Sequence, residues 1–354
     1  KQSSTQILSL SCRKIVMSLI ETIWYQKLNK KNCLAIVLLY PLSLLFRVIT
    51  FVRRYFYKHH LLKVTTLKVP SIVVGGISVG GSGKTPLSIA LIEYLSNCGY
   101  KVGLVSRGYK GKAKSYPLVV NTDTKACESG DEPLLIKMAL QDKVTVCVDP
   151  NKDRGCKFLE EKGVDVIVSD DGLQHYSLDF DIEIVVLDGK RLLGNGFLMP
   201  AGPLREGKWH LKTCDAVVVN GETKIDNAYN MQLVPDKVVP LTYFLKHQGD
   251  SKALDTTEGV VAMAGIGNPK RFYNTLENLG YSITNTIEVS DHQKLSDEQV
   301  LSFAHENKVV MTAKDAVKYA HLQSDNLYVL NVQASLDNSF FEKIKQKLID
   351  RINP

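Results

Sequence analysis

Short apolar runs alternate along the chain with stretches whose apolar residues have helical spacing. At residues 71–77, a run rich in β-branched residues predicts a buried strand. The next apolar residues fall on one helix face: Leu87, Ala90, Leu91 and Leu95. Similar runs predict strands at residues 102–106, 144–148, 164–169, 182–187 and 216–219. Because fully apolar strands alternate with helices, we expect an α/β fold: a parallel sheet with helices on both faces and ligands at the carboxyl ends of its strands.

A second, shorter series of alternating elements begins near residue 240. Its strands are expected at residues 259–264, 283–289, 309–312 and 327–332, and a closing helix at 340–352. This series predicts a smaller C-terminal α/β lobe at residues 236–354, following a main domain at residues 67–235. We expect the lobe to contribute to the active-site cleft.

The amino-terminal part of the chain has a different pattern. Residues 33–52 are mostly apolar and long enough to cross a membrane. Several other residues recur at three- and four-residue steps on one helix face: Tyr40, Ser43, Arg47, Thr50, Arg54 and Lys58. We therefore expect residues 17–66 to hold an amphipathic helix that lies at a membrane surface and bends at Pro41. A membrane span and a helix packed on the protein are the alternatives, and residues 1–16 are expected to be an extension.

The charge distribution supports a membrane-facing amino terminus. Twelve of the 44 Lys and Arg residues, but only one of the 37 acids, lie in residues 1–70, which leaves +11 there and −4 over the rest. This asymmetry favours contact with an anionic lipid surface and argues against a nucleic-acid-binding body. The seven cysteines are scattered and form no C-x-x-C pair, which argues against a disulfide framework or a zinc site.

The glycine-rich sequence after the first strand is the strongest chemical signal. It reads Ser78-Val79-Gly80-Gly81-Ser82-Gly83-Lys84-Thr85. Glycines let successive backbone N–H groups converge on an anion at a helix N-terminus. Lys84 is expected to reach the outer phosphates of a nucleotide, and the Thr85 hydroxyl to hold Mg²⁺. Ser78 stands where this motif usually has glycine, and a plain glycine turn is the alternative.

Asp170 and Asp171 follow the apolar run at residues 164–169. An apolar strand that ends in acids downstream of a phosphate-binding loop predicts a Mg²⁺ site, because Mg²⁺ binds few carboxylates together with phosphates and water. Gln174 and His175 come next and are expected beside the nucleotide. A solvated helix cap is the alternative to the metal site.

Three further positions carry candidate catalytic groups. Asp131 precedes a helix, where it serves either as an N-cap or as a carboxylate that accepts a hydroxyl proton. A proline-rich turn presents Arg205, which could neutralise charge at a transferring phosphoryl group, next to Glu206, a further candidate Mg²⁺ ligand. A surface ion pair is the alternative for this turn. His292 lies in the second lobe and is either structural or functional.

Taken together, these motifs resemble the tetraacyldisaccharide 4'-kinase family of lipid A biosynthesis. The resemblance runs from about Ile20 to the end of the chain and includes the Ser78 of the glycine-rich loop. The other matching motifs are Ser106-Arg107-Gly108-Tyr109, Gly130-Asp131-Glu132-Pro133, Asp170-Asp171-Gly172-Leu173-Gln174-His175, Pro200-Ala201-Gly202-Pro203-Leu204-Arg205-Glu206, Ala264-Gly265-Ile266-Gly267, Asp291-His292 and Thr312-Ala313-Lys314-Asp315-Ala316-Val317. The chain departs from the family at Gln293, often His, and at Ala313, usually Glu.

The resemblance implies a kinase that moves the γ-phosphate of ATP to the 4'-hydroxyl of an acylated glucosamine disaccharide 1-phosphate. It implies ATP and Mg²⁺ as cofactors and a place on the cytoplasmic face of the bacterial inner membrane. Asp131, aided by His292, would take the proton from the sugar hydroxyl, and Arg205 would stabilise developing charge. We expect no nucleic acid and no obligate protein partner.

Two other functions are consistent with the phosphate-binding loop. One is a membrane-anchored ATPase or GTPase that works as a switch or a metal-insertion factor, and the other is a non-catalytic nucleotide-binding scaffold. Residues 151–154 lack the spacing of a guanine-specific N-K-x-D motif, so adenine is expected. The scarcity of clustered Cys and His also counts against metal insertion.

Overall fold

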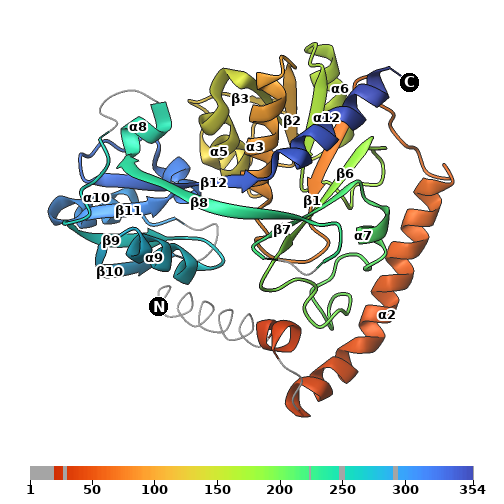
Figure 1. Ribbon diagram of the computed structural model, residues 1–354, viewed down its shortest axis with the longest axis horizontal. Helices are drawn as coiled ribbons and strands as arrows, with labels where there is room; N and C mark the ends of the chain where they lie inside the picture. The colour runs from red at the N-terminus through yellow and green to blue at the C-terminus, as the bar shows by residue number, and fades with distance from the viewer. Residues whose placement is uncertain (1–19, 27–29, 223–224, 247–251, 290–293, 354) are drawn as a thin grey trace.

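The computed structural model describes residues 20–26, 30–222, 225–246, 252–289 and 294–353. Within these ranges, twelve strands form one continuous sheet (Figure 1). The strands are β1 (Ser71–Gly75), β2 (Val102–Ser106), β3 (Leu118–Val120), β4 (Val144–Val148), β5 (Val166–Asp170), β6 (Ile182–Asp188), β7 (Ala216–Asn220), β8 (Tyr229–Pro240), β9 (Gly259–Ala264), β10 (Ser282–Glu288), β11 (Lys308–Thr312) and β12 (Leu327–Leu336). The expected extension at residues 1–16 lies outside the described residues.

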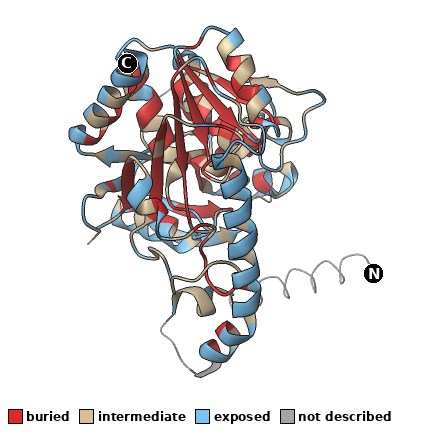
Figure 2. Ribbon diagram, turned by 90° about the vertical axis from the view of Figure 1, so that its right-hand side faces the viewer, coloured by how far each residue is buried: buried red, intermediate tan, exposed pale blue. Residues whose placement is uncertain are grey.

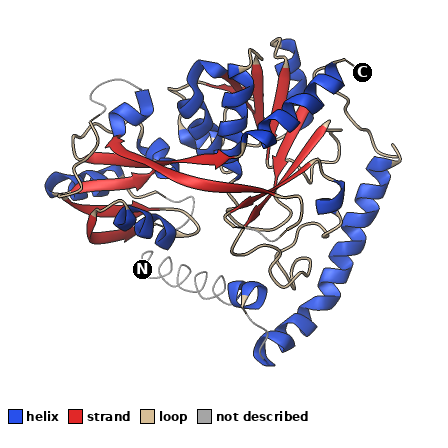
Figure 3. Cartoon of the chain, in the orientation of Figure 1, coloured by secondary structure: helices blue, strands red, loops and turns tan. Residues whose placement is uncertain are grey.

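Helices cover both faces of the sheet, as expected for this fold class (Figure 3). They are α2 (Lys30–Lys58), α3 (Lys84–Asn97), α4 (Ala126–Ser129), α5 (Asp131–Leu140), α6 (Lys152–Glu161), α7 (His210–Thr213), α8 (Leu241–Lys246), α9 (Pro269–Asn278), α10 (Asp297–Glu306), α11 (Ala313–Ala316) and α12 (Asn338–Ile352). Residues 20–25 are helical as well, and there are two short 3₁₀ turns, η1 (Gln141–Lys143) and η2 (Val317–Tyr319).

The strand order explains how the two halves are joined. It runs β10-β9-β11-β12-β8-β7-β6-β1-β5-β2-β4-β3, with parallel pairing from β7 to β4. The long strands β8 and β12 pair antiparallel to each other in the middle of the sheet. The sheet of the first half therefore continues into the second half, and β8 crosses the boundary predicted at residue 236. The division into a main domain at residues 67–235 and a smaller lobe at residues 236–354 stays a prediction.

The closing helix α12 packs against the first half of the chain. Three of its apolar side chains belong to the buried cluster that also contains strand residues of β1 and β6. These α12 residues are Phe340, Ile344 and Leu348. Polar contacts hold it in place, because Lys347 Nζ lies 2.7 Å from Asp215 Oδ1 and Tyr94 donates to Glu342 at 2.8 Å. The last helix of the second series thus covers the phosphate-loop half.

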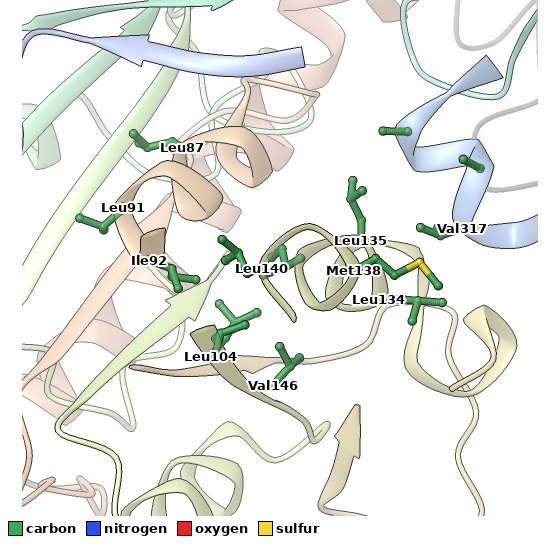
Figure 4. Close-up of a cluster of buried hydrophobic side chains, with 14 of the residues drawn as sticks. Leu87, Leu91, Ile92, Leu104, Leu134, Leu135, Met138, Leu140, Val146 and Val317 are labelled. Atoms are coloured by element: carbon green, nitrogen blue, oxygen red, sulfur yellow. The ribbon is translucent and has the colours of Figure 1, made fainter. Parts of the chain in front are cut away.

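Alternate strand residues face opposite layers, and this gives the sheet two buried sides. Ile72 and Val74 of β1 pack with α3 and α5 on one side, and Val73 packs with Leu173 and Val185 on the other. Figure 4 shows the first of these layers, where side chains of α3, α5, β2 and β4 point toward one another. Val317 of η2 joins the same cluster, so the two halves share an apolar contact.

Helix α2 leaves its apolar face uncovered (Figure 2). Most of its large apolar side chains are exposed: Leu34, Val37, Leu38, Leu42, Leu44, Leu45, Val48, Ile49, Phe51 and Val52. Ser43 is buried, and Arg54 is half-buried, on the side that packs against the protein. The helix continues through Pro41, where a bend is expected, and is apolar and long enough to cross a membrane by length and composition. Part of the expected polar stripe therefore faces the protein and not the membrane surface.

A buried leucine and an exposed leucine should differ in their contribution to stability. Leu91→Ala removes a fully buried side chain in the layer of Figure 4 and should lower the free energy of unfolding by about 2–5 kcal/mol. Leu38→Ala, at a position 70% exposed on α2, should change it by less than about 0.5 kcal/mol. Chemical denaturation of both variants in the same detergent checks this, and equal losses would contradict the placement of the core.

Candidate active site

The glycine-rich loop joins the end of β1 to the start of α3. Gly80 and Gly83 have φ values of +123° and +93°, in the left-handed region that favours glycine. A Cβ at Gly83 would lie 2.7 Å from Asn220 Nδ2, so the loop fits tightly against the end of β7. The loop ends at Lys84, the first residue of a 14-residue helix, where backbone N–H groups and the helix dipole favour an anion.

The first residues of the loop are partly used by a neighbouring segment. The Val79 N–H donates to Pro203 O at 2.9 Å, and Ser78 forms a β-bridge with Leu204. Ser82 is buried, and its hydroxyl oxygen has no hydrogen-bond partner among the described residues. Thr85 is the second residue of α3 and is half-buried. The loop therefore offers its second half, from Gly80 onward, to a phosphate.

The acid pair stands beside this loop because β1 and β5 are parallel neighbours. Val74 pairs with Asp170, and the Asp171 N–H donates to Val74 O at 2.8 Å. Asp171 lies between two cations: its Oδ1 is 3.6 Å from Lys84 Nζ and its Oδ2 is 3.3 Å from Arg205 Nη1. The sheet thus brings the sequence-predicted Lys84, Asp170, Asp171 and Arg205 to one edge.

The two carboxyl groups differ in their electrostatics. Burial, with the nearby Glu132 and Asp171 charges, raises the pKa of Asp170 to about 7. Burial also acts to raise the pKa of Asp171, but Lys84 and Arg205 outweigh it and lower that pKa. Asp170 Oδ1 and Asp171 Oδ1 are both buried without a hydrogen-bond partner among the described residues. A cation between them would satisfy both oxygens and favour their charged forms.

Lys152 lies behind the acid pair and was not predicted as a site residue. It is fully buried at the start of α6, and its Nζ donates to Ser169 Oγ at 3.0 Å and to the Asp170 carbonyl. Burial lowers its pKa to about 8, while the charges of Asp170 and Asp171 act in the opposite direction. Lys152 therefore holds the backbone at Asp170, the first of the two acids.

Gln174 and His175 connect the loops around the expected nucleotide. Gln174 Nε2 donates to Gly76 O at 3.2 Å, which ties the acid segment to the glycine-rich loop. His175 Nδ1 lies 3.0 Å from Arg107 Nη2, and its Nε2 lies 3.4 Å from Asp153 Oδ1. Burial, with the charges of Lys152 and Arg107, lowers the pKa of His175 to about 4, so the ring is neutral at pH 7. Both side chains bond to protein in this structure, and their role toward a nucleotide stays a prediction.

Asp131 begins helix α5 and faces residues of the second half. Its Oδ2 is 3.8 Å from Lys318 Nζ, and Glu132 beside it is 3.2 Å from Lys314 Nζ. Lys318 is buried and also bonds Asp315 at 2.7 Å. His292, its expected partner, lies outside the described residues, as do Asp291 and Gln293. The two lysines were not predicted, although they lie in or next to the matching motif at 312–317.

A cavity of about 1050 Å³ opens beside Asp131, between α4, α5 and the α11–η2 segment. Its lining includes several basic side chains: Lys110, Lys125, Lys294, Lys318 and His321. Apolar groups such as Met138, Leu245 and Val317 line it as well. The cavity therefore combines positive charge with apolar surface next to a carboxylate.

Glu206 has partners that the sequence did not indicate. Both of its carboxylate oxygens are engaged, one by the Tyr176 hydroxyl and the other by His210 Nδ1. The described residues contain no group of three or more His, Cys, Asp or Glu that could hold a metal ion. The role of Glu206 as a Mg²⁺ ligand stays a prediction. Asp170 and Asp171, in contrast, each keep one buried oxygen that has no hydrogen-bond partner among the described residues.

Comparison with known proteins decides the family. A family model described as LpxK, tetraacyldisaccharide-1-P 4'-kinase, matches residues 35–349. The chain belongs to this family. It is 43% identical over 339 residues to the tetraacyldisaccharide 4'-kinase of Shewanella halifaxensis, covering 95% of this chain and 99% of that one. It is 40% identical over 331 residues to the enzyme of the same name from Vibrio parahaemolyticus, covering 93% and 96%.

A solved structure of this 4'-kinase family has the same fold. It is described as the "apo" form of LpxK from Aquifex aeolicus in complex with ATP, and it matches with a TM-score of 0.71 at 28% identity. The match covers 87% of this chain and 98% of that one. The resemblance and the fold class predicted from the sequence are thereby confirmed. Membership in a lipid 4'-kinase family does not favour a switch, a metal-insertion factor or a scaffold.

The neutral, buried His175 predicts how stability depends on pH. The unfolded chain binds a proton at this ring below about pH 6.5, whereas the folded chain binds it only near pH 4. The free energy of unfolding of the parent should therefore fall as pH decreases from 6.5 to 4.5. His175→Gln keeps a donor and an acceptor but does not titrate, so its free energy of unfolding should fall by about 1–3 kcal/mol less over the same range. Denaturation curves at pH 7.5, 6 and 5 measure the difference. A constant difference across this range would contradict the neutral ring.

Proposed function

We propose that this chain transfers the γ-phosphate of ATP to the 4'-hydroxyl of tetraacyldisaccharide 1-phosphate, giving the 1,4'-bisphosphate, lipid IVA. The observation that supports it most is a set of buried oxygens near Lys84 that have no hydrogen-bond partner among the described residues: Ser82 Oγ, Asp170 Oδ1 and Asp171 Oδ1. Unpartnered buried polar atoms are unfavourable unless a ligand completes them. The glycine-rich loop on one side and two carboxylates on the other fit a magnesium-bound triphosphate.

The residues at the sheet edge divide into phosphate and metal groups. The loop amides from Gly80 to Gly83 and the Lys84 ammonium would hold the outer phosphates of ATP. Thr85 and Asp170, with Asp171 beside them, would hold Mg²⁺, which supplies positive charge to the transferring phosphate. Arg205 is tied to Asp171 and would neutralise charge that develops on the equatorial oxygens.

Asp131 would accept the proton of the sugar hydroxyl. It stands at the N-terminus of α5, on the wall of the cavity and near Lys318. A carboxylate at this place is a group that can accept a hydroxyl proton. His292 would assist it, as the family resemblance implies. The lysines of the cavity wall suit an acceptor that carries a phosphate, and its apolar groups suit acyl chains.

Helix α2 would bring the enzyme to the lipid. Its exposed apolar face carries no Lys, Arg, Asp or Glu over residues 32–46, and the exposed basic residues Arg47 and Lys58 follow. An exposed apolar stripe next to basic side chains suits an anionic membrane surface. The acceptor would then approach along the membrane plane on the cytoplasmic side, where ATP is present.

Loss of the proposed base should affect turnover much more than ATP binding. Asp131→Ala should lower kcat about 10²–10⁴-fold, because general-base catalysis contributes in that range. The affinity for Mg·ATP should stay within about twofold, since Asp131 lies outside the glycine-rich loop. Labelled ATP, Mg²⁺ and disaccharide 1-phosphate in detergent give the rates, and Asp142→Ala, at an exposed position of η1, is the control. Near-normal turnover of Asp131→Ala would remove the proposed base.

Charges placed on the apolar face of α2 should release the protein from lipid. Leu45→Glu with Ile49→Glu should weaken binding to vesicles of phosphatidylethanolamine and phosphatidylglycerol at least about tenfold, because each exposed side chain contributes apolar area on insertion. Leu301→Glu, an exposed leucine on α10, is the matched control and should bind like the parent. Vesicle co-sedimentation measures this, and unchanged binding of the double variant would contradict the role of α2.

A further inference from the structure

Residues 197–210 lie between helix α2 and the glycine-rich loop and bond to both. On the loop side, Arg205 N–H donates to Ile77 O at 2.7 Å, and Pro203 O accepts from Val79 N–H at 2.9 Å. These bonds fix the backbone of Arg205 relative to the phosphate-binding loop. A shift of this segment would therefore move Arg205 away from Asp171.

On the other side, the same segment is bonded to the middle of α2. The Ser43 hydroxyl donates to Leu198 O at 2.8 Å and accepts from the Ala201 N–H at 3.0 Å. Ser43 is only 4% exposed, although its helix neighbours Leu42 and Leu44 are exposed. The helix that carries the uncovered apolar face is thus joined directly to the segment that carries Arg205.

Glu206, the residue after Arg205, is held by a buried set of polar groups. The Tyr176 hydroxyl donates to its Oε1, and His210 Nδ1 donates to its Oε2. Glu206 and His210 are 3% and 2% exposed, and His210 Nε2 lies 3.1 Å from Glu183 Oε2. Because buried carboxylates are stable only when paired, these bonds fix the side chain and the backbone at residue 206. We call Tyr176, Glu206 and His210 the Glu206 clamp.

Two arginines of α2 lie against the aromatic rings at this clamp. Arg53 Cζ is 5.6 Å from the centre of the Tyr176 ring, and Arg54 Cζ is 3.4 Å from the centre of the Trp209 ring. Trp209 in turn stacks on His210, with the ring centres 4.9 Å apart. Cation–π contacts at these distances are attractive. Each side chain that bonds Glu206 is therefore in contact with α2, directly or through one ring.

We propose that the Glu206 clamp positions Arg205 for phosphoryl transfer and that helix α2 holds the clamp in place. Tyr176 and His210 are then positioning residues, and Glu206 acts through Arg205 and not as a metal ligand. The proposal rests on the proposed function, because it takes Arg205 to act on the transferring phosphate. It links the part of the chain that meets lipid to a catalytic side chain through named contacts.

The first test removes one bond of the clamp. Tyr176→Phe keeps the ring under Arg53 but loses the hydroxyl that bonds Glu206, and should lower kcat about tenfold with KM for ATP within about twofold. Tyr57→Phe is the matched control, because Tyr57 lies against both Tyr176 and Arg53 through its ring. Equal kcat for the parent and Tyr176→Phe would overturn the proposal, while an inactive parent would instead contradict the proposed function.

A second test separates positioning from metal binding. Glu206→Gln should lower kcat and leave the Mg²⁺ concentration for half-maximal rate within about twofold. A tenfold or larger rise in that concentration would show that Glu206 holds the metal and would overturn the proposal. Thermal unfolding of each variant is the control for folding: a Tm equal to that of the parent shows that the compared proteins are folded.

A third test addresses the link to α2. Arg53→Gln should lower kcat, as Tyr176→Phe does. The fold-decrease in kcat of the double variant should be smaller than the product of the two single fold-decreases, because both changes act through one clamp. Fully independent effects would contradict the link between α2 and the clamp.

Discussion

The arrangement of this molecule depends on one carboxylate between two cations. Asp171, directly after β5, lies 3.6 Å from Lys84 and 3.3 Å from Arg205. These two cations come from segments that are far apart in the sequence. Lys84 is positioned by a glycine-rich turn and a helix start, and Arg205 by backbone bonds to Ile77. The three segments meet only because β1, β5 and β6 are parallel neighbours and end at the same edge. This edge concentrates charge and holds buried oxygens that have no hydrogen-bond partner among the described residues, which suits it to the triphosphate and metal that we propose to bind there.

The surroundings of that carboxylate connect the two substrates of a lipid kinase. One half of the sheet supplies the glycine-rich loop and the acids, and strands β8 and β12 extend the sheet to the half that supplies Lys314 and Lys318 beside Asp131. Helix α2 stands outside the sheet with its apolar face uncovered and its Ser43 side against residues 198–201 (Figure 2). The proposed nucleotide site and the helix with the uncovered apolar face thus share one intervening segment.

Much of the fold could be predicted from local patterns. Strands β1, β2, β4, β5, β6 and β7 are buried almost throughout, so their apolar runs mark them to within about two residues. Strand β8 was not predicted, because its exposed positions carry residues such as Asn230, Gln232 and Lys237. Its pairing with β12 and β7 joins the two halves, and such long-range pairing leaves no local signal. The return of α12 to the first half was missed for the same reason.

The grouping of the candidate site residues could be predicted where the motifs are local. The glycine-rich loop and the acid pair are contiguous motifs, and the structure brings Lys84, Asp171 and Arg205 together. The partners of Glu206 could not be predicted, because Tyr176 lies 30 residues away in the sequence and is brought near only by packing. The buried Lys152 shows the same limit, since its bond to Ser169 spans 17 residues between a helix and a neighbouring strand. For α2, periodicity separates polar from apolar positions but does not say which face meets the protein.

The most direct measurement of the central claim is the affinity for Mg·ATP of the parent and of Lys84→Ala, by calorimetric titration. The account predicts that the parent binds Mg·ATP and that Lys84→Ala, which leaves Asp171 with Arg205 alone, binds at least about tenfold more weakly. Equal affinities for the two proteins, or no binding by the parent, would contradict it.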